Sequence, residues 1–277
     1  MSSASAHATS RKNYATADAK TVALAEIIDN IRQDKIHKVL VVGCGSGREA
    51  GVLARRWSAY TVGIDTGAQF AFQTAAAAPA QLRIMDAEAL EFESDEFDLV
   101  YSFHALEHIK DSDQALAEMS RVLRPGGAFC IGTPNSHRLI GYLGSPVSIA
   151  DKVRWNLADW HARLAGRWSN QAGAHAGFSE DELLAACRRA FGAGESVSAA
   201  YYAQLRPHAL STRLVNTMPL GKWLRPCCYI AGVAAEADGM RCLDRRFLPD
   251  SGAGEKTARR LTGCVPAPYR PSSPAAS

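Results

Sequence analysis

The stretch VLVVGCGSGREAGVLARRW, residues 39–57, decides the fold. Four apolar residues are followed by a loop with Gly43, Gly45 and Gly47, and then by a run of residues with helical spacing. This order predicts a strand, a tight loop, and a helix whose N-terminus can hold a ligand. A dinucleotide-binding loop would have a further glycine where this chain has Arg48, so the spacing argues against NAD.

The strand-and-turn pattern returns along the chain. YTVGIDTG (60–67) ends on a turn that contains Asp65, AQLRIMDAEAL (80–90) has Asp86 at the corresponding place, and FDLVYS (97–102) is a fourth apolar segment. Helices alternate with these strands, so we expect a parallel, doubly wound sheet with ligands bound beyond the carboxyl ends of its strands. Further elements are predicted with less regular patterns: a helix over 18–33, a helix that begins at Asp111, a helix with a capping box of Ser179 and Glu182, and strands over 195–202 and 227–235.

The composition is that of an ordinary globular protein. The 277 residues are 47% hydrophobic and carry a net charge of +3, which is too mild to indicate nucleic acid as a partner. Seven cysteines without a C-x-x-C pair suggest neither a disulfide framework nor a zinc ribbon, and they favour a cytoplasmic location. No apolar run is long enough to span a bilayer.

The glycine loop and the two strand-end carboxylates form a recognisable set. A carboxylate at the end of the second strand can accept both hydroxyls of a ribose, although a solvated turn aspartate would be a fair rival if Asp65 stood alone. Together, VLVVGCGSG, VGID, MDAEAL, FDLVYSFHALEHI and RVLRPGGAFCIGTPN resemble the class I S-adenosylmethionine-dependent methyltransferases, in the branch of quinone and other small-molecule methyltransferases (methyltransferase type 11). The resemblance covers about residues 35–205. It implies a Rossmann-like, seven-stranded α/β sheet whose last strand is antiparallel.

The resemblance also implies the site residues. The set that would bind S-adenosylmethionine comprises Gly43, Cys44, Gly45 and Gly47 at the methionine part, Asp65 at the ribose, Asp86 and Ala87 at the adenine, and Ser102 and Phe103 at the sulfonium. Where the family usually has an acidic residue in the first strand, this chain has Val41. That departure keeps a second reading open, namely a non-catalytic protein that uses the fold for binding or as a scaffold.

Two histidines follow the fourth strand. His104 and His108 with Glu107 match the H-x-x-E-H pattern of an inverted zinc peptidase, which would need both histidines on one helix and a further ligand downstream. Within the methyltransferase order they belong instead to the loop after the fourth strand, and no metal is expected. His104 and His108 are the catalytic candidates, with His104 as the base that takes a proton from the acceptor. The alternative is that His104 shapes the pocket and His108 packs against the loop.

The acceptor side is predicted from the resemblance and from aromatic residues. The N-terminal region and a helical insertion at about 136–177, after the fifth strand, supply five candidates: Tyr14, His137, Trp155, Trp160 and His161. Tryptophans with interleaved arginines would suit an aromatic, sugar-like or anionic acceptor, and the candidates could equally pack as core. The acceptor that we expect is a small molecule or a sugar or lipid intermediate of the cell envelope. Nucleic acid is disfavoured because the chain reads Ser102-Phe103-His104-Ala105 where an N-P-P-Y-like stretch would stand.

The chain organisation follows from the same patterns. We expect one methyltransferase domain over 13–249 with its core at 35–205, and disordered tails at 1–12 and 250–277. PLGKWLRPCCYIAGVAA (219–235) has basic residues beside an apolar run, so it either docks at a membrane surface or packs as the final strand. The sequence does not determine the oligomeric state.

Overall fold

The computed structural model describes residues 19–32, 34–67, 80–142, 147–170, 176–205 and 221–235. By contacts between residues the chain divides into two units, 1–241 and 242–277, and all the described residues belong to the first. The predicted tails and Tyr14 lie outside the described residues, so the predicted domain boundaries stay predictions.

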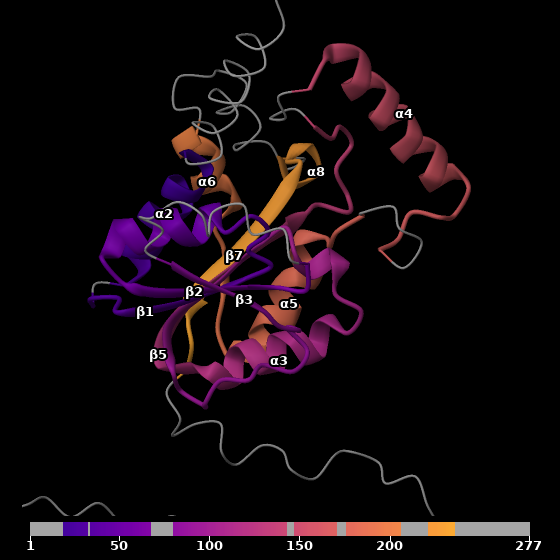
Figure 1. The fold of residues 1–277 in the computed structure, drawn as a ribbon. Coiled ribbons are helices and arrows are strands. Elements are labelled where there is room, and N and C mark those ends of the chain that lie inside the picture. Colours follow the sequence, from indigo (N-terminus) through magenta and orange to yellow (C-terminus); the bar gives the residue numbers. More distant parts are fainter. Residues whose placement is uncertain are drawn as a thin grey trace, which may run out of the picture. The chain divides into compact units, whose positions relative to one another are not determined.

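One sheet of seven strands forms the centre of the described fold (Figure 1). Its strands, in spatial order, are β3 (Ala80–Ile84), β2 (Tyr60–Asp65), β1 (Lys38–Val42), β4 (Phe97–Phe103), β5 (Leu123–Pro134), β7 (Cys227–Val233) and β6 (Glu195–Ser196). The first five along the chain pair in parallel, whereas β7 runs antiparallel to both β5 and β6. The predicted Rossmann-like sheet with an antiparallel last strand is therefore confirmed.

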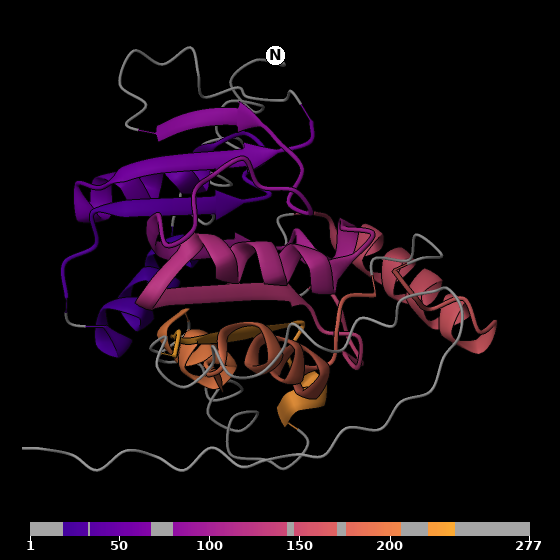
Figure 2. The ribbon, with the colours of Figure 1, turned by 90° about the horizontal axis from the view of Figure 1, so that it is seen from below.

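Helices lie on both faces of this sheet (Figure 2). They are a helix over residues 19–31, α2 (Arg48–Trp57), the short 3-10 helix η1 (Leu106–His108), α3 (Ser112–Val122), α4 (Ile149–Leu164), α5 (Glu180–Phe191), α6 (Ser198–Leu205) and α8 (Gly221–Leu224). The two faces bury separate cores: α3 and α5 contribute to one, and helix 19–31, α2 and α6 to the other. Alternate residues of β1 enter opposite cores, with Leu40 and Val42 in the first and Val39 and Val41 in the second. A strand covered on both faces explains the unbroken apolar run in the sequence.

The region after α5 differs from its prediction. Only Glu195–Ser196 of the expected strand 195–202 pairs with the sheet, and α6 begins at Ser198. The Ser198 hydroxyl accepts a hydrogen bond from the backbone N–H of Tyr229 on β7, and the Tyr201 ring lies 4.2 Å from the Tyr229 ring. Packing against β7 thus selects a helix for a segment whose composition alone suggested a strand.

The described part of the segment 219–235, residues 221–235, contains two elements. Its apolar part is β7, which pairs with β5 over the full length from Cys227 to Val233, so the final-strand reading is confirmed. Trp223, on α8 before the strand, is 43% exposed. No helix among the described residues is long and apolar enough to cross a membrane.

Candidate cofactor and acceptor site

The glycine loop between β1 and α2 lies at the carboxyl end of β1. Gly43, Gly45 and Gly47 all have positive φ, at +71°, +50° and +82°, a region that glycine enters without steric cost. The backbone N–H groups of Gly43 and Cys44 both donate to the carbonyl of Ile64 on β2, at 2.9 Å each. The loop is therefore held against the neighbouring strand, and it leads directly into the N-terminus of α2.

The space around the three glycines shows what the loop can accommodate. A Cβ at Gly43 would meet the Cβ of Ala105 at 2.1 Å, and one at Gly47 would meet Leu82 at 2.3 Å, so these two positions are closed by packing. A Cβ at Gly45 would meet nothing within 4 Å. The open position in the middle of the loop is where a ligand can approach the backbone closely, as the methionine part of S-adenosylmethionine requires.

Asp65 at the end of β2 is connected to this loop. One of its carboxylate oxygens accepts the N–H of Gly45 at 2.8 Å, and the other accepts the N–H of Gly67 at 2.9 Å. The side chain is half-buried. Each carboxylate oxygen can accept more than one hydrogen bond, so the same group can receive ribose hydroxyls while it fixes the loop.

Asp86 lies beside Asp65, because the N–H of Met85 donates to the backbone carbonyl of Asp65 at 3.1 Å. The Asp86 side chain is exposed and accepts the N–H of Glu88 at 2.9 Å, while Ala87 is buried. Cys44 is also buried, and burial raises the pKa of its thiol to about 12. The protonated thiol is a packing group and not a nucleophile.

The end of β4 carries the residues expected to face the reacting centre. Ser102 is 1% exposed, and its hydroxyl has no hydrogen-bond partner among the described residues. The Phe103 ring lies 4.4 Å from the His104 ring and 5.8 Å from that of Tyr229. A buried hydroxyl without a partner costs free energy, and a ligand that hydrogen-bonds to it at this strand end would offset that cost.

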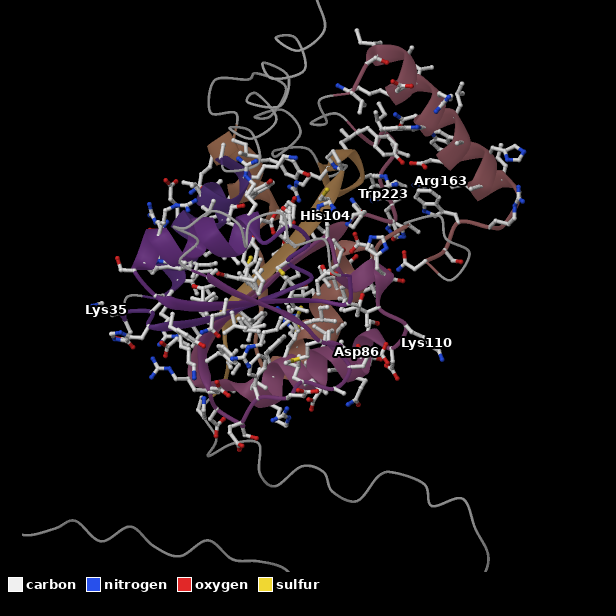
Figure 3. All side chains as sticks on the ribbon, in the orientation of Figure 1. Lys35, Asp86, His104, Lys110, Arg163 and Trp223 are labelled. Carbon is white, nitrogen blue, oxygen red and sulfur yellow. The ribbon has the colours of Figure 1, made fainter. Side chains whose placement is uncertain are left out.

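His104 has an unusual backbone and a perturbed imidazole. Its φ is +56°, and its N–H donates to the carbonyl of Gly132 on β5 at 2.8 Å. Burial lowers the pKa of the imidazole, an effect that the negative charges of Glu107 and Glu49 oppose. Nδ1 lies 3.9 Å from Oε1 of Glu107, whose own pKa is raised by burial. Figure 3 labels His104 among the side chains of this region. A neutral imidazole in a constrained position can accept a proton.

His108 does not share a helical face with His104. It follows on η1, its side chain is 54% exposed, and its Nε2 lies 3.9 Å from the same oxygen of Glu107. The zinc-peptidase pattern would need both histidines on one helix, whereas here His104 precedes η1 in the left-handed region. The described part of the chain holds no group of three or more histidine, cysteine or acidic residues arranged for a metal.

Two residues that the sequence did not single out belong to this region. Glu49 lies in the first turn of α2, and burial raises its pKa to about 7, against the opposing charges of His104, Lys20 and Arg48. Its position directly after the glycine loop was an available signal. Arg138 is 5% exposed, and its charge acts on both His104 and Glu107. No sequence signal distinguished it from the other arginines of the insertion.

The four predicted acceptor residues within the described part of the chain contact different neighbours. His137 is exposed, with its ring 5.9 Å from that of Trp223. Trp155 on α4 contacts Tyr142, with ring centroids 5.0 Å apart, and Trp160 donates from Nε1 to the carbonyl of Leu139 at 3.2 Å. His161 is exposed on α4. The structure thus confirms a helical insertion and places these residues on it and on the loop beside it.

Comparisons with known proteins agree with this geometry. Residues 40–131 match the family model described as a methyltransferase domain. The chain is 36% identical over 102 residues to methyltransferase GfsG of Streptomyces halstedii, covering 34% of this chain and 37% of that protein. It is 35% identical over 121 residues to the chloroplastic tocopherol O-methyltransferase of Arabidopsis thaliana, covering 41% and 35%.

A third relative is matched over a longer stretch. The chain is 30% identical over 157 residues to the trans-aconitate 2-methyltransferase of Azoarcus sp. strain BH72, covering 54% of this chain and 56% of that protein. The chain therefore spans between about a third and about half of the length of these relatives. The matched family model, the strand order and the glycine loop with its carboxylates agree, and the chain carries a class I S-adenosylmethionine-dependent methyltransferase domain.

Proposed function

We propose that this protein transfers a methyl group from S-adenosylmethionine to an ionisable oxygen or nitrogen of a small-molecule acceptor, with His104 as the base. The observation that carries the proposal is the constrained His104 with a lowered pKa at the end of β4, the strand next to the glycine loop. Sugar or lipid intermediates of the cell envelope are included in the proposed acceptor class. The cofactor supplies a methyl group already activated on a sulfonium, so the protein mainly aligns the acceptor and removes its proton.

The cofactor would be held by residues of four strand ends. Gly45 offers an open backbone position, and Asp65 offers carboxylate oxygens to the ribose hydroxyls. Asp86 and Ala87 would lie at the adenine, and Ser102 and Phe103 at the sulfonium. The donor set fits the group, because charge-assisted hydrogen bonds and a close backbone approach are both available.

The proton would leave the acceptor through His104. Its lowered pKa keeps the imidazole neutral and able to accept at neutral pH. Glu107, 3.9 Å away and almost fully buried, would stabilise the imidazolium that forms. The exposed His108 has the less constrained position, so we assign the base role to His104 alone.

The relatives support a small molecule as the acceptor. Two of them are named for tocopherol and for trans-aconitate, neither of which is a macromolecule. A binding or scaffold protein remains the second candidate, because Val41 stands where the family usually has an acid and is fully buried between Gly63 and Tyr101 of the neighbouring strands.

Calorimetry separates the two candidates. The protein should bind S-adenosylmethionine and S-adenosylhomocysteine but not NAD, and Asp65→Ala should weaken binding roughly ten- to a hundredfold, because the hydroxyls lose a charged acceptor. Asp113→Ala is the matched control, since Asp113 is an exposed acid on α3 whose side chain pairs with Arg189. If the folded protein binds neither adenosyl ligand, the result would favour the hypothesis of a non-catalytic binding or scaffold protein.

Once an acceptor is found by screening, His104→Asn tests the base. Asparagine tolerates positive φ but cannot take the proton, so turnover should fall roughly a hundredfold or more while cofactor affinity is kept. His108→Asn should leave turnover close to that of the unmodified protein. Equal losses in the two variants would contradict the assignment of the base to His104.

A further inference from the structure

Helix α4 directs an apolar stripe toward solvent. Positions three and four residues apart share a helical face, and on one face of α4 all five side chains are apolar. Their exposed fractions are high: Ile149 81%, Val153 55%, Leu157 65%, Trp160 42% and Leu164 85%. None of the residues of α4 is buried. The stripe therefore contributes nothing to the described cores.

The polar side of α4 holds the helix to the protein. Asn156 bonds both the N–H and the carbonyl of Gly141, at 2.7 and 3.2 Å. Asp159 pairs with Arg138 at 3.0 Å, and Arg163, labelled in Figure 3, donates to the carbonyl of Arg138 at 2.7 Å. An amphipathic helix normally turns its apolar face inward, and these polar contacts reverse that arrangement.

The charges around the stripe are mostly positive. The four cations of α4 and the turn after it are Lys152, Arg154, Arg163 and Arg167, against the two acids Asp151 and Asp159. Both acids are engaged: Asp151 accepts from the Ser148 hydroxyl at 2.7 Å, and Asp159 pairs with Arg138. Arg163 is engaged as well, by the carbonyl of Arg138; at helical spacing, Arg154 borders one edge of the stripe and Lys152 the other. The face is complementary to an anionic surface.

Further exposed apolar side chains adjoin the stripe. Trp160 bonds the carbonyl of Leu139, and the N–H of Leu139 donates to the carbonyl of Trp223 on α8 at 2.9 Å. Leu139 is 37% exposed, Ile140 48% and Trp223 43%. Tryptophan is favoured where an apolar interior meets water, as at a bilayer surface.

We infer that α4 docks this protein on a lipid surface that carries anionic head groups. A helix of 16 residues with an apolar stripe and flanking cations fits the plane of such a surface, with its apolar face in the acyl boundary. The flanking cations favour lipid over a second copy of this chain, whose own α4 would present the same positive charge. The inference does not depend on methyl transfer, because lipid binding needs neither cofactor nor acceptor.

Flotation of the full chain with lipid vesicles tests the inference. The protein should float with vesicles of phosphatidylcholine and phosphatidylglycerol. Leu157→Glu should weaken that binding by about tenfold or more, because a charge replaces an anchoring side chain. Ala158→Glu is the matched control: it puts the same charge on the next residue, which is also exposed but lies outside the stripe, and most of the binding should remain. No flotation, or equal losses in the two variants, would overturn the inference.

Two further measurements distinguish other occupants. Arg154→Gln should weaken binding about fivefold, and binding to phosphatidylcholine alone should be much weaker than to the anionic mixture. Equal binding to the two vesicle types would overturn the electrostatic part of the inference. Light scattering after gel filtration reports self-association: a dimer that Leu157→Glu converts to a monomer would mean that a second copy covers the stripe, and would overturn lipid docking.

Discussion

Glu49 is half-buried, although its sequence position suggests an exposed side chain. It stands in the first turn of α2, where an acid suits the helix dipole, yet burial raises its pKa to about 7 from an ordinary 4.5. Its charge acts on His104 and on the buried Tyr101. Ionising this carboxylate in the folded protein costs free energy, so the effect of Glu49 on stability depends on pH.

We expect Glu49→Gln to reveal that cost. The folded protein holds the proton of Glu49 more tightly than the unfolded chain, so this group lowers stability as pH rises from 4.5 to about 7. Relative to the unmodified protein, the variant should gain up to about 3 kcal/mol between about pH 5 and pH 8, and His104 contributes to this difference because the Glu49 charge raises the pKa of its imidazole. Urea unfolding at the two pH values measures it.

The exposed acid of helix 19–31, Glu26, provides the control. Glu26→Gln should change the free energy of unfolding by less than about 0.5 kcal/mol at either pH, as surface substitutions usually do. If the stability difference between Glu49→Gln and the unmodified protein is the same at both pH values, the pKa of Glu49 is not raised in the folded protein.

At the scale of elements, α4 and α5 begin in the same way but pack differently. Ser148 and Ser179 each accept the backbone N–H three residues on, at 3.1 and 3.2 Å, and Ser179 also completes a capping box with Glu182. Helix α5 buries Leu183, Cys187 and Phe191, whereas α4 buries none of its residues. Equal caps should therefore have unequal effects on the whole protein.

Replacing each cap with alanine tests this difference. Ser179→Ala should lower the free energy of unfolding by about 1 kcal/mol, because α5 unfolds together with the core. Ser148→Ala should change it by a few tenths of a kcal/mol, because α4 can fray without opening the core. Chemical denaturation gives both values. An equal loss for the two variants would indicate that α4 is part of the cooperative core.

At the scale of the whole described fold, Asp98 joins segments that are distant in sequence. Its carboxylate accepts the N–H groups of His37 and Lys38 at 2.7 and 2.9 Å, ahead of β1 and at its start. It also pairs with Arg124 of β5 at 2.5 Å and with Arg32, after helix 19–31, at 4.0 Å. Asp98 and Arg32 are both buried, so water cannot solvate either charge if its partner is removed.

Asp98→Ala should therefore destabilise the protein by roughly 3–5 kcal/mol, because it leaves the Arg32 charge buried and two backbone donors without an acceptor. Asp113→Ala removes an ion pair whose two side chains are 74% and 63% exposed, and it should cost less than about 1 kcal/mol. Thermal and urea unfolding of the pair measure the difference. Similar small losses would mean that solvent reaches the Asp98 cluster.

The sequence by itself determined the sheet, the glycine loop and the strand-end carboxylates. These features are local: an unbroken apolar run marks a strand covered on both faces, and glycines at fixed spacing mark a backbone that must turn at positive φ. Asp65 could be placed beside the loop because parallel strands end at one edge. The cap of α5 was likewise readable, since a serine with a glutamate three residues on satisfies the helix N-terminus locally.

Only the tertiary structure decided the features that depend on contacts between elements distant in sequence. Residues 198–202 form a helix because Ser198 and Tyr201 pack on β7, a strand about thirty positions later in the chain. The raised pKa of Glu49 and the burial of Arg138 depend on neighbours from several elements, which no local pattern records. The sequence predicted a helical insertion but not the direction of its apolar side chains, and the stripe on α4 faces outward because another side of the helix is bonded to Gly141 and Arg138.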